Sequence, residues 1–267
     1  MSQRLHHVHI HRAPGMGISA MELASNHSFP RHSHDEYGIG VVLSGAQRSW
    51  SGVGLVESFP GDVITVNPGE IHDGHPVDGA ARRWRIIYFD PEVLCRQFTP
   101  DVPQEIEFVS PSLTDHALGH CVNLLFNRLL EHADLLGIEE MVAHVVQRLI
   151  PHEARPAGHA RTYSVPVTKA RARIDDDPSN PVTLAELAAL SGTSRYQIVR
   201  AFSRELGTTP YAYVIQRRVR LARELLMNGE TLAAAAQLAG FADQSHMTRA
   251  FARQFGVSPG RYVAAGA

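Results

Sequence analysis

The stretch RAFSRELGTTPYAY (residues 200–213) occurs a second time further along the chain in altered form. The second copy, RAFARQFGVSPGRY (residues 249–262), matches it at seven of fourteen positions with a constant offset of 49 residues. In both copies a glycine follows the apolar and basic run, and a proline stands three residues later. Glycine just past the last helical residue, followed by proline, is typical of a helix end. The repeat therefore predicts two helices of the same kind.

A second repeated segment precedes each of these helices. TLAELAALSG (183–192) and TLAAAAQLAG (231–240) share six of ten residues at an offset of 48. Because the offset then changes to 49, the second copy has one extra residue in its turn. Each copy has the order helix, glycine turn and helix, which is a helix-turn-helix. Suitable capping residues stand at the expected helix starts: Thr183 with Glu186, Ser194 with Gln197, and Asp243.

The second helix of each copy has one apolar face and one polar face. The spacing predicts a buried stripe of Ile198, Ala201, Phe202, Leu206, Met247, Ala250, Phe251 and Phe255. The outward positions carry mainly Arg, Gln, Ser and Thr, which are suited to base edges and phosphates in a major groove. A solvated helix face is the alternative for one isolated motif. Two matched copies favour DNA reading.

Charge is divided between the two parts of the chain. Residues 166–267 carry thirteen Lys/Arg and eight Asp/Glu, whereas residues 1–165 carry twelve and nineteen. The C-terminal part is therefore basic, with a net charge of +5, although the whole chain has a net charge of −2. A basic domain favours nucleic-acid binding, and an unevenly charged solvated surface is the alternative.

The segment between the two copies has a length that suits DNA. Residues 211–229 have the pattern of one continuous helix. About seventeen helical residues span about 26 Å, and successive major grooves on one face of DNA recur about every 34 Å. A rigid helix of this length holds two reading helices near that separation, so one chain can read two adjacent grooves.

Residues 166–267 closely resemble the DNA-binding domain of AraC/XylS-type bacterial transcription regulators. The matching motifs are A-x-x-S-G-x-S-x-x-x-[apolar]-x-R-x-F (188–202), R-x-x-x-A-x-x-L-L (218–226) and GFADQSHMTRAFARQFGVSPGRY (240–262). The resemblance implies DNA contacts at Arg195, Tyr196, Val199, Arg200, Gln244, Ser245, His246, Thr248 and Arg249. Val199 is a departure, since an apolar side chain meets only a thymine methyl. Copy one is therefore expected to carry less base specificity.

The N-terminal part has the pattern of an antiparallel β domain. Short β-like runs at 16–25, 37–45, 62–69 and 82–90 are separated by Gly, Pro and Asn, as in a sandwich or barrel. Two helical segments follow, with apolar stripes Leu118, Val122, Leu125 and Leu129, and Ile138, Val142, Val145 and Leu149. These stripes suit pairing of the two helices, contact with a second subunit, or a cover on the barrel.

Histidines cluster in the β-rich part, in RHSHDEYGIGVVLSG (31–45) and PGDVITVNPGEIHDG (60–74). In a strand, His32, His34 and Glu36 would share one face, and His72 follows a PGE turn. Such a set can hold a divalent metal. The pattern resembles the two motifs of the cupin barrel, although metal-binding cupins place the glutamate later. Hydrogen-bonded histidines along a strand are the structural alternative.

In an AraC-type regulator, the resemblance implies that this domain senses a small effector, and most such sensors need no metal. We expect the effector contacts to come from His32, His34, Glu36, Tyr37, His72 and Arg85. Our expectation is no cofactor, with a divalent metal at His32, His34 and His72 as the less favoured alternative. A carboxylate on the effector would suit an inward Arg85, but a surface position for that residue is equally compatible with the sequence.

The sequence thus predicts an α+β chain of two domains. We assign residues 1–111 to a cupin-like antiparallel barrel, 112–150 to a helical dimerisation segment, 151–165 to a linker and 166–267 to an all-α domain with two helix-turn-helix units. The predicted function is effector-controlled, sequence-specific regulation of transcription, with activation the more common sign in the family and RNA polymerase a further partner.

Two other functions compete with this prediction. One is a metal-dependent cupin enzyme fused to a DNA-binding module, and the other is a nonspecific architectural DNA binder. No Ser-His-Asp set with supporting context, phosphate loop or CxxC motif is present, so we expect no catalytic activity. Only two cysteines and no apolar run of about eighteen residues occur, which favours a cytoplasmic location without membrane contact. We expect a homodimer, formed through the helical segment 112–150.

Overall fold

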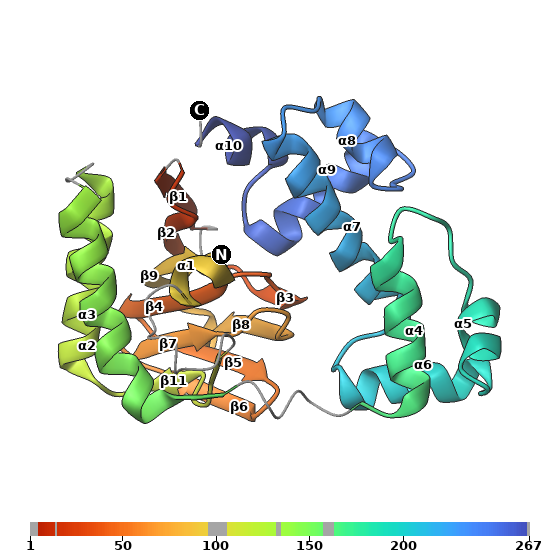
Figure 1. Ribbon diagram of the computed structural model, residues 1–267, viewed down its shortest axis with the longest axis horizontal. Coiled ribbons are helices and arrows are strands. Elements are labelled where there is room, and N and C mark those ends of the chain that lie inside the picture. The colour runs from red at the N-terminus through yellow and green to blue at the C-terminus, as the bar shows by residue number, and fades with distance from the viewer. Residues whose placement is uncertain (1–4, 14, 96–105, 132–134, 157–162, 266–267) are drawn as a thin grey trace. The chain divides into compact units, whose positions relative to one another are not determined.

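The computed structural model describes residues 5–13, 15–95, 106–131, 135–156 and 163–265 (Figure 1). The chain divides into two compact units near residue 160, one mainly of strands and one of helices. The boundary lies within the segment expected as a linker. The predicted α+β class is confirmed, and each unit is described by itself below.

The two main sheets of the N-terminal unit are antiparallel and face each other. The larger sheet has the strand order β1 (His6–Ala13), β2 (Ile18–Ser25), β9 (Arg82–Phe89), β4 (Tyr37–Ser44), β7 (Val63–Val66) and β11 (Ser112–Leu113). The smaller sheet has the order β3 (Phe29–His32), β8 (His72–Pro76), β5 (Gln47–Ser51) and β6 (Gly54–Ser58). Each of the four β-like runs predicted from the sequence contains a strand of the larger sheet. Two short helical turns complete this unit, η1 (Val77–Gly79) and α1 (Pro91–Cys95).

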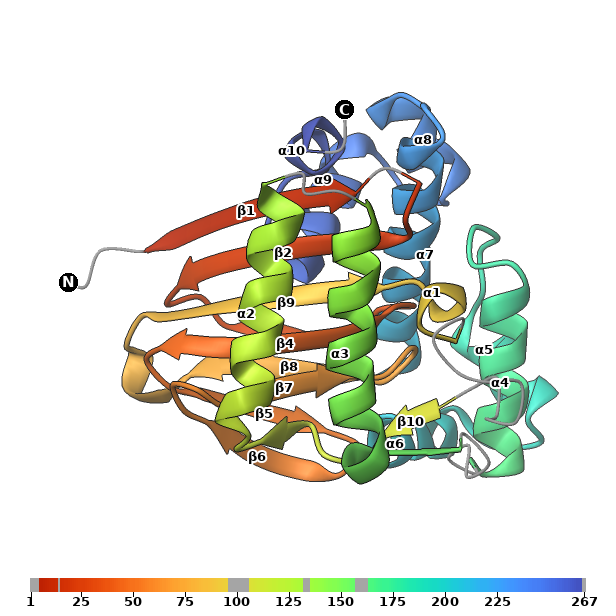
Figure 2. The same ribbon diagram turned by 60° about the vertical axis from the view of Figure 1, so that its left-hand side comes forward.

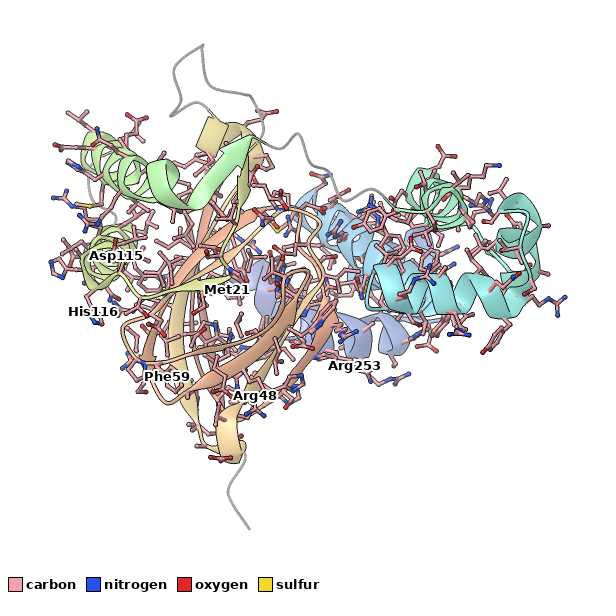
Figure 3. All side chains as sticks on the ribbon, turned by 90° about the horizontal axis from the view of Figure 1, so that it is seen from below. Met21, Arg48, Phe59, Asp115, His116 and Arg253 are labelled. Carbon is pink, nitrogen blue, oxygen red and sulfur yellow. The ribbon has the colours of Figure 1, made fainter. Side chains whose placement is uncertain are left out.

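Two helices, α2 (His116–Leu130) and α3 (Leu135–Glu153), lie across the outer face of the larger sheet (Figure 2). The start of α2 is capped by Asp115, whose carboxylate accepts the Leu118 amide at 2.9 Å (Figure 3). That hydrogen bond lowers the pKa of the Asp115 carboxyl from its ordinary value. The apolar stripes of both helices are buried in the core that they share with the sheet. Of the three uses considered for these stripes, the structure shows two, since α2 and α3 pack against each other and share their core with the sheet. Contact with a second subunit stays a prediction.

Both ends of the segment expected to be a linker, residues 151–165, form regular secondary structure instead. Its first residues complete α3, and β12 (Ala154–Pro156) then pairs antiparallel with β10 (Ile106–Phe108). Its last residue begins the first helix of the C-terminal unit. The Pro, Gly and charged residues of this segment suggested irregular structure. A short extended segment that contains a proline can nevertheless pair through its remaining backbone amides and carbonyls, which is why composition did not predict β12.

The C-terminal unit contains two helix-turn-helix pairs, as predicted. Its helices are α4 (Val165–Asp176), α5 (Leu184–Leu190), α6 (Arg195–Glu205), α7 (Pro210–Met227), α8 (Leu232–Leu238), α9 (Gln244–Phe255) and α10 (Pro259–Ala264). The α5–α6 turn has four residues and the α8–α9 turn has five, which confirms the extra residue. Helix α7 confirms the continuous connecting helix and runs between the two pairs (Figure 1).

Sequence-encoded caps and apolar stripes position the second helix of each pair. Ser194 and Gln197 form a reciprocal capping box at α6, and the Asp243 side chain accepts the His246 amide at 2.7 Å at α9. Within the predicted buried stripes, four side chains have no surface exposed to solvent: Ile198, Phe202, Met247 and Phe251. Burying this stripe leaves the opposite face of each helix outward. In the described part of the chain, no helix is long and apolar enough to span a membrane.

Candidate DNA-reading helices and effector site

The outward face of α6 carries the side chains predicted to contact DNA in the first copy. Arg195, Tyr196 and Arg200 are exposed, and 68% of Tyr196 is accessible to solvent. Arg200 donates a hydrogen bond to the Tyr196 hydroxyl at 3.3 Å, and its guanidinium lies 5.5 Å from the centre of that ring. Val199 is half-buried. This face thus offers two arginines and a tyrosine around one small apolar side chain.

The outward face of α9 is more polar. Gln244, Ser245 and Arg249 are exposed, while His246 and Thr248 are half-buried. The His246 ring lies edge-on to the Phe241 ring with 5.2 Å between ring centres. His246 is therefore held at the margin of the face. Amide, hydroxyl and guanidinium groups together suit both base edges and phosphates in a major groove.

Hydrogen bonds from a side chain of α7 to backbone carbonyls fix the second helix-turn-helix pair to the segment before α5. The Arg218 guanidinium on α7 donates to the carbonyl of Pro178 at 2.7 Å and to that of Gly240 at 2.5 Å. Gly240 lies in the α8–α9 turn with φ +78°, and a Cβ built there would overlap the Ser179 carbonyl oxygen. The Arg218 side chain thus joins the loop before α5 to the α8–α9 turn.

Helix α4 is attached to the same connecting helix by a polar network. The Tyr213 hydroxyl on α7 donates to Asp175 on α4 at 2.8 Å, and Arg217 pairs with Asp175 at 2.9 Å. The Arg171 guanidinium donates to the Tyr213 hydroxyl at 3.3 Å. Because α7 contributes to both networks, it is the element that sets the orientation of the two pairs within this unit.

In the N-terminal unit, three histidines come together where the two sheets face each other. His32 on β3 stands directly opposite His72 on β8, and their ring centres lie 4.5 Å apart. The His34 ring lies 4.9 Å from the His32 ring and 5.3 Å from the His72 ring. On the opposite sheet, the Tyr88 ring of β9 lies 5.0 Å from that of His34. The histidines singled out from the sequence therefore form one cluster.

The route by which these residues meet differs from the prediction. We expected residues 32 to 36 in one strand, but β3 ends at His32 and β4 begins at Tyr37. His34 reaches the cluster from the intervening segment, so the two-residue alternation of a strand does not apply there. Glu36 is buried but is not part of the group of metal-ligating atoms that the three histidines form.

Tyr37 does not point into the space between the sheets. It lies in the core under α2 and α3, and its hydroxyl donates to the Ile106 carbonyl at 2.6 Å. Its position in β4 has the same parity as Ile39 and Val41, which belong to the same core. Tyr37 therefore lies apart from the histidine cluster with which the sequence analysis grouped it.

Arg85 also faces the helices. Its guanidinium donates to Glu22 at 2.8 Å and to Asn127 on α2 at 3.0 Å. The same group lies over the Phe126 ring, 4.5 Å from its centre. Since Arg85 alternates with Trp84 and Ile86 along β9, it must lie on the face opposite to theirs. Of the two positions that we considered for Arg85, the inward one is excluded.

Arg82 is the inward arginine, and it was not among the predicted site residues. Its guanidinium donates to the Gln47 side chain at 3.0 Å and to the carbonyls of His27 at 3.0 Å and Gly74 at 3.1 Å. It also lies over the Trp84 ring, 4.6 Å from its centre. Burial lowers the pKa of this guanidinium to about 10, so it stays charged at neutral pH. The sequence does place Arg82 on the same strand face as Trp84, Ile86 and Tyr88, because alternate residues of the run RRWRIIYF share a face. It does not show which of the two faces is the inward one.

A paired helix-turn-helix unit joined to a β domain with an inner polar cluster defines a ligand-responsive DNA-binding protein. Two family models match the chain in this order. An AraC-like ligand binding domain matches residues 19–146, and a helix-turn-helix domain matches residues 187–265. The chain belongs to the AraC-type transcriptional regulators. Its regulatory function follows from the two domains, one for DNA and one for an effector.

The chain is similar to two curated transcriptional regulators and to one solved structure. An uncharacterized helix-turn-helix transcriptional regulator of Bacillus subtilis, YbfI, is 29% identical over 232 residues, covering 82% of this chain and 81% of its own. The transcriptional activator NphR of a Rhodococcus species is 39% identical over 82 residues, which cover 30% of this chain and 24% of NphR. A crystal structure of ToxT from Vibrio cholerae covers 99% of this chain and 98% of its own at a TM-score of 0.51. Its sequence identity is 12%, so that likeness shows the shared fold.

Proposed function

We propose that α6 and α9 read two adjacent major-groove segments of one operator. The reading residues are Arg195, Tyr196, Val199, Arg200, Gln244, Ser245, His246, Thr248 and Arg249. The observation that carries this proposal is the outward placement of these side chains on two equivalent helices, each fixed by a buried stripe and an N-terminal cap. Helix α7 has eighteen residues, and at 1.5 Å each they span about 27 Å, close to the recurrence of the groove.

The effector site in this proposal lies between the two sheets, at His32, His34 and His72. Tyr88 and the buried Glu36 are its further candidates, and the proposal leaves out Tyr37 and Arg85 because they face the helices. Imidazole, phenol and carboxylate groups together favour a polar small molecule. Effector binding acts by favouring one arrangement of the protein over another.

The proposal extends to the protein's other partners, its location and its oligomeric state. The bound regulator contacts RNA polymerase and activates transcription, acts as a homodimer in the cytoplasm and has no catalytic activity of its own. The likeness to the activator NphR supports the sign of regulation. Because the α2 and α3 stripes are buried in their own core, a dimer contact on these helices uses their outer faces.

Footprinting on the DNA upstream of the protein's own and neighbouring genes tests the proposal. We expect discrete protected sites, each with two contacts about one helical turn apart. The salt concentration must be fixed and random competitor DNA present, because nonspecific affinity depends steeply on salt. Uniform protection at all sequences would instead indicate an architectural DNA binder.

Replacing Arg249 by alanine is expected to weaken operator binding by about 1–3 kcal/mol, because this exposed side chain on α9 reaches a base edge or phosphate. The measurement is a gel-shift titration of operator and random duplexes at the same salt. Arg261→Ala is the matched control, since it removes an exposed arginine of α10, outside both reading helices. Equal affinity of Arg249→Ala and wild type for the operator would remove Arg249 from the reading surface.

A further inference from the structure

The His32, His34 and His72 cluster has a geometry that goes beyond polar contact with an effector. One ligand atom from each of the three rings lies within 4.8 Å of those of the other two. His32 and His34 are buried, with 7% and 6% of their surfaces exposed, and His72 is half-buried. Three histidines whose ligand atoms lie close together, two of them buried, form a recurring ligand set for a transition metal.

Hydrogen bonds hold two of the rings in the form that binds metal. The Nδ1 atom of His32 lies 2.7 Å from the Pro30 carbonyl oxygen, and that of His72 lies 3.0 Å from the Glu70 carbonyl oxygen. A carbonyl oxygen only accepts, so each Nδ1 must carry the proton and donate it. In a neutral imidazole the lone pair then resides on Nε2, which is the usual metal-binding arrangement.

The pairing of strands β3 and β8 limits where the ring nitrogens of His32 and His72 can lie. His32 and His72 are cross-strand partners, so the β3–β8 pairing sets the spacing of their Cα atoms before any ligand binds. The Tyr88 hydroxyl lies 3.5 Å from Nε2 of His34, which places an oxygen of the opposite sheet beside the third ring. The cluster is thus supported by backbone carbonyls, a strand register and a phenol, none of which depends on the metal.

We propose that His32, His34 and His72 bind one divalent transition-metal ion of the zinc class. Imidazole ligands suit Zn²⁺, Ni²⁺, Cu²⁺ and Fe²⁺. Zn–N bonds are about 2.0–2.1 Å long, and the ligand atoms of the three histidines already lie within 4.8 Å of one another. Three protein ligands leave a coordination position open to a small molecule or water. This inference rests on the histidines alone and stands independently of the operator.

Metal titration of the full-length, untagged protein after chelator treatment is the test. We expect one Co²⁺ or Zn²⁺ per chain, followed by the visible absorption of bound Co²⁺ and by elemental analysis. His72→Gln and His34→Gln should each lose at least about tenfold in affinity, since even second-shell substitutions cost about 10–100-fold. His75→Gln is the matched control, because His75 lies on the same strand but outside the cluster.

Thermal unfolding provides a second readout. Both tryptophans, Trp50 and Trp84, lie in the N-terminal unit, so their fluorescence reports on the domain that holds the site. Zn²⁺ at a hundredfold excess over its dissociation constant should raise this melting midpoint by roughly 5–10 °C in wild type and His75→Gln. His72→Gln should show no such rise.

Two results would overturn the proposal. One is a wild-type protein that binds no metal ion per chain. The other is a metal-free, folded His72→Gln variant, by circular dichroism, that binds Co²⁺ as tightly as wild type. If His72→Gln does not fold, His34→Gln decides, because residue 34 lies outside the strands. If neither folds, the wild-type stoichiometry and the Zn²⁺-dependent melting midpoint decide.

Discussion

Replacing Gly240 by alanine is expected to destabilise the DNA-binding unit by roughly 2–5 kcal/mol. Gly240 has φ +78°, a conformation in which a side chain is strained. A Cβ at this position would overlap the Ser179 carbonyl oxygen and lie 2.8 Å from the Ser179 Cα. Because the obstruction is backbone, it cannot be relieved by rotation of a side chain, and the α8–α9 turn must separate from the loop before α5.

The repeat supplies a matched control for this substitution. Gly192 occupies the same place in the turn of the first copy and has φ +64°, but nothing lies within 4 Å of a Cβ built there. Gly192→Ala therefore has the conformational strain without the clash, and its cost should be about 1–2 kcal/mol. The difference between the two variants measures how tightly the second turn packs against the first pair.

Two spectroscopic signals separate the domains in this experiment. Most of the helical residues, and so most of the far-UV circular dichroism at helical wavelengths, belong to the C-terminal unit, although α2 and α3 also contribute. Both tryptophans lie in the N-terminal unit. In urea, Gly240→Ala should shift the helical transition to lower concentration and leave the tryptophan transition in place. Equal destabilisation by Gly192→Ala and Gly240→Ala would mean that the contact with Ser179 is not maintained in solution.

The two helix-turn-helix pairs and the connecting helix of the C-terminal unit could be predicted from sequence because their signals are local, whereas α4 and α10 were not predicted. Helix periodicity, caps such as Asp243 and a repeat offset by 48 and then 49 residues each specify structure over a few turns. The outward face of α6 and α9 then follows from the buried stripe. What the sequence did not provide is the Arg218 contact with Gly240, since it joins residues that are distant in sequence and involves backbone carbonyls.

The effector region was less predictable because it depends on strand parity and strand ends. Arg85 and Trp84 are neighbours in β9 and therefore lie on opposite faces of the sheet, Arg85 toward α2 and Trp84 inward. The sequence alone provided no reason to prefer either face for Arg85. The short break between β3 and β4 removed the alternation on which the grouping of His34 with Glu36 depended. Both faces of the larger sheet are covered, one by helices and one by the smaller sheet, so the hydrophobic pattern does not distinguish them.

Replacing Arg218 by methionine is expected to reduce affinity for a two-groove operator by roughly 10–100-fold. Methionine fills much of the same space but cannot donate to the carbonyls of Pro178 and Gly240. Hydrogen bonds from a charged group are each worth about 1.5–3 kcal/mol, so their loss loosens the link between the two pairs. Each reading helix keeps its own side chains, but the second no longer follows the first into the adjacent groove.

The readout must distinguish this effect from general unfolding. Affinity is measured on the full operator and on a duplex that retains only one of the two protected segments, at the same salt. If Arg218 positions the two pairs, the loss appears on the full operator and is small on the single segment, because only the former requires both helices at once. A similar loss on both duplexes would mean that the substitution damages each reading helix.

Arg217→Met is the control that removes the same charge one residue earlier on α7. Arg217 pairs with Asp175 on α4 at 2.9 Å and thus fastens a different helix, so its loss should affect stability more than two-groove affinity. If Arg217→Met and Arg218→Met reduced full-operator affinity equally, long-range charge would explain the result. A selective effect of Arg218 would show that the repeated reading helices act as one unit because a single side chain fixes their relative orientation.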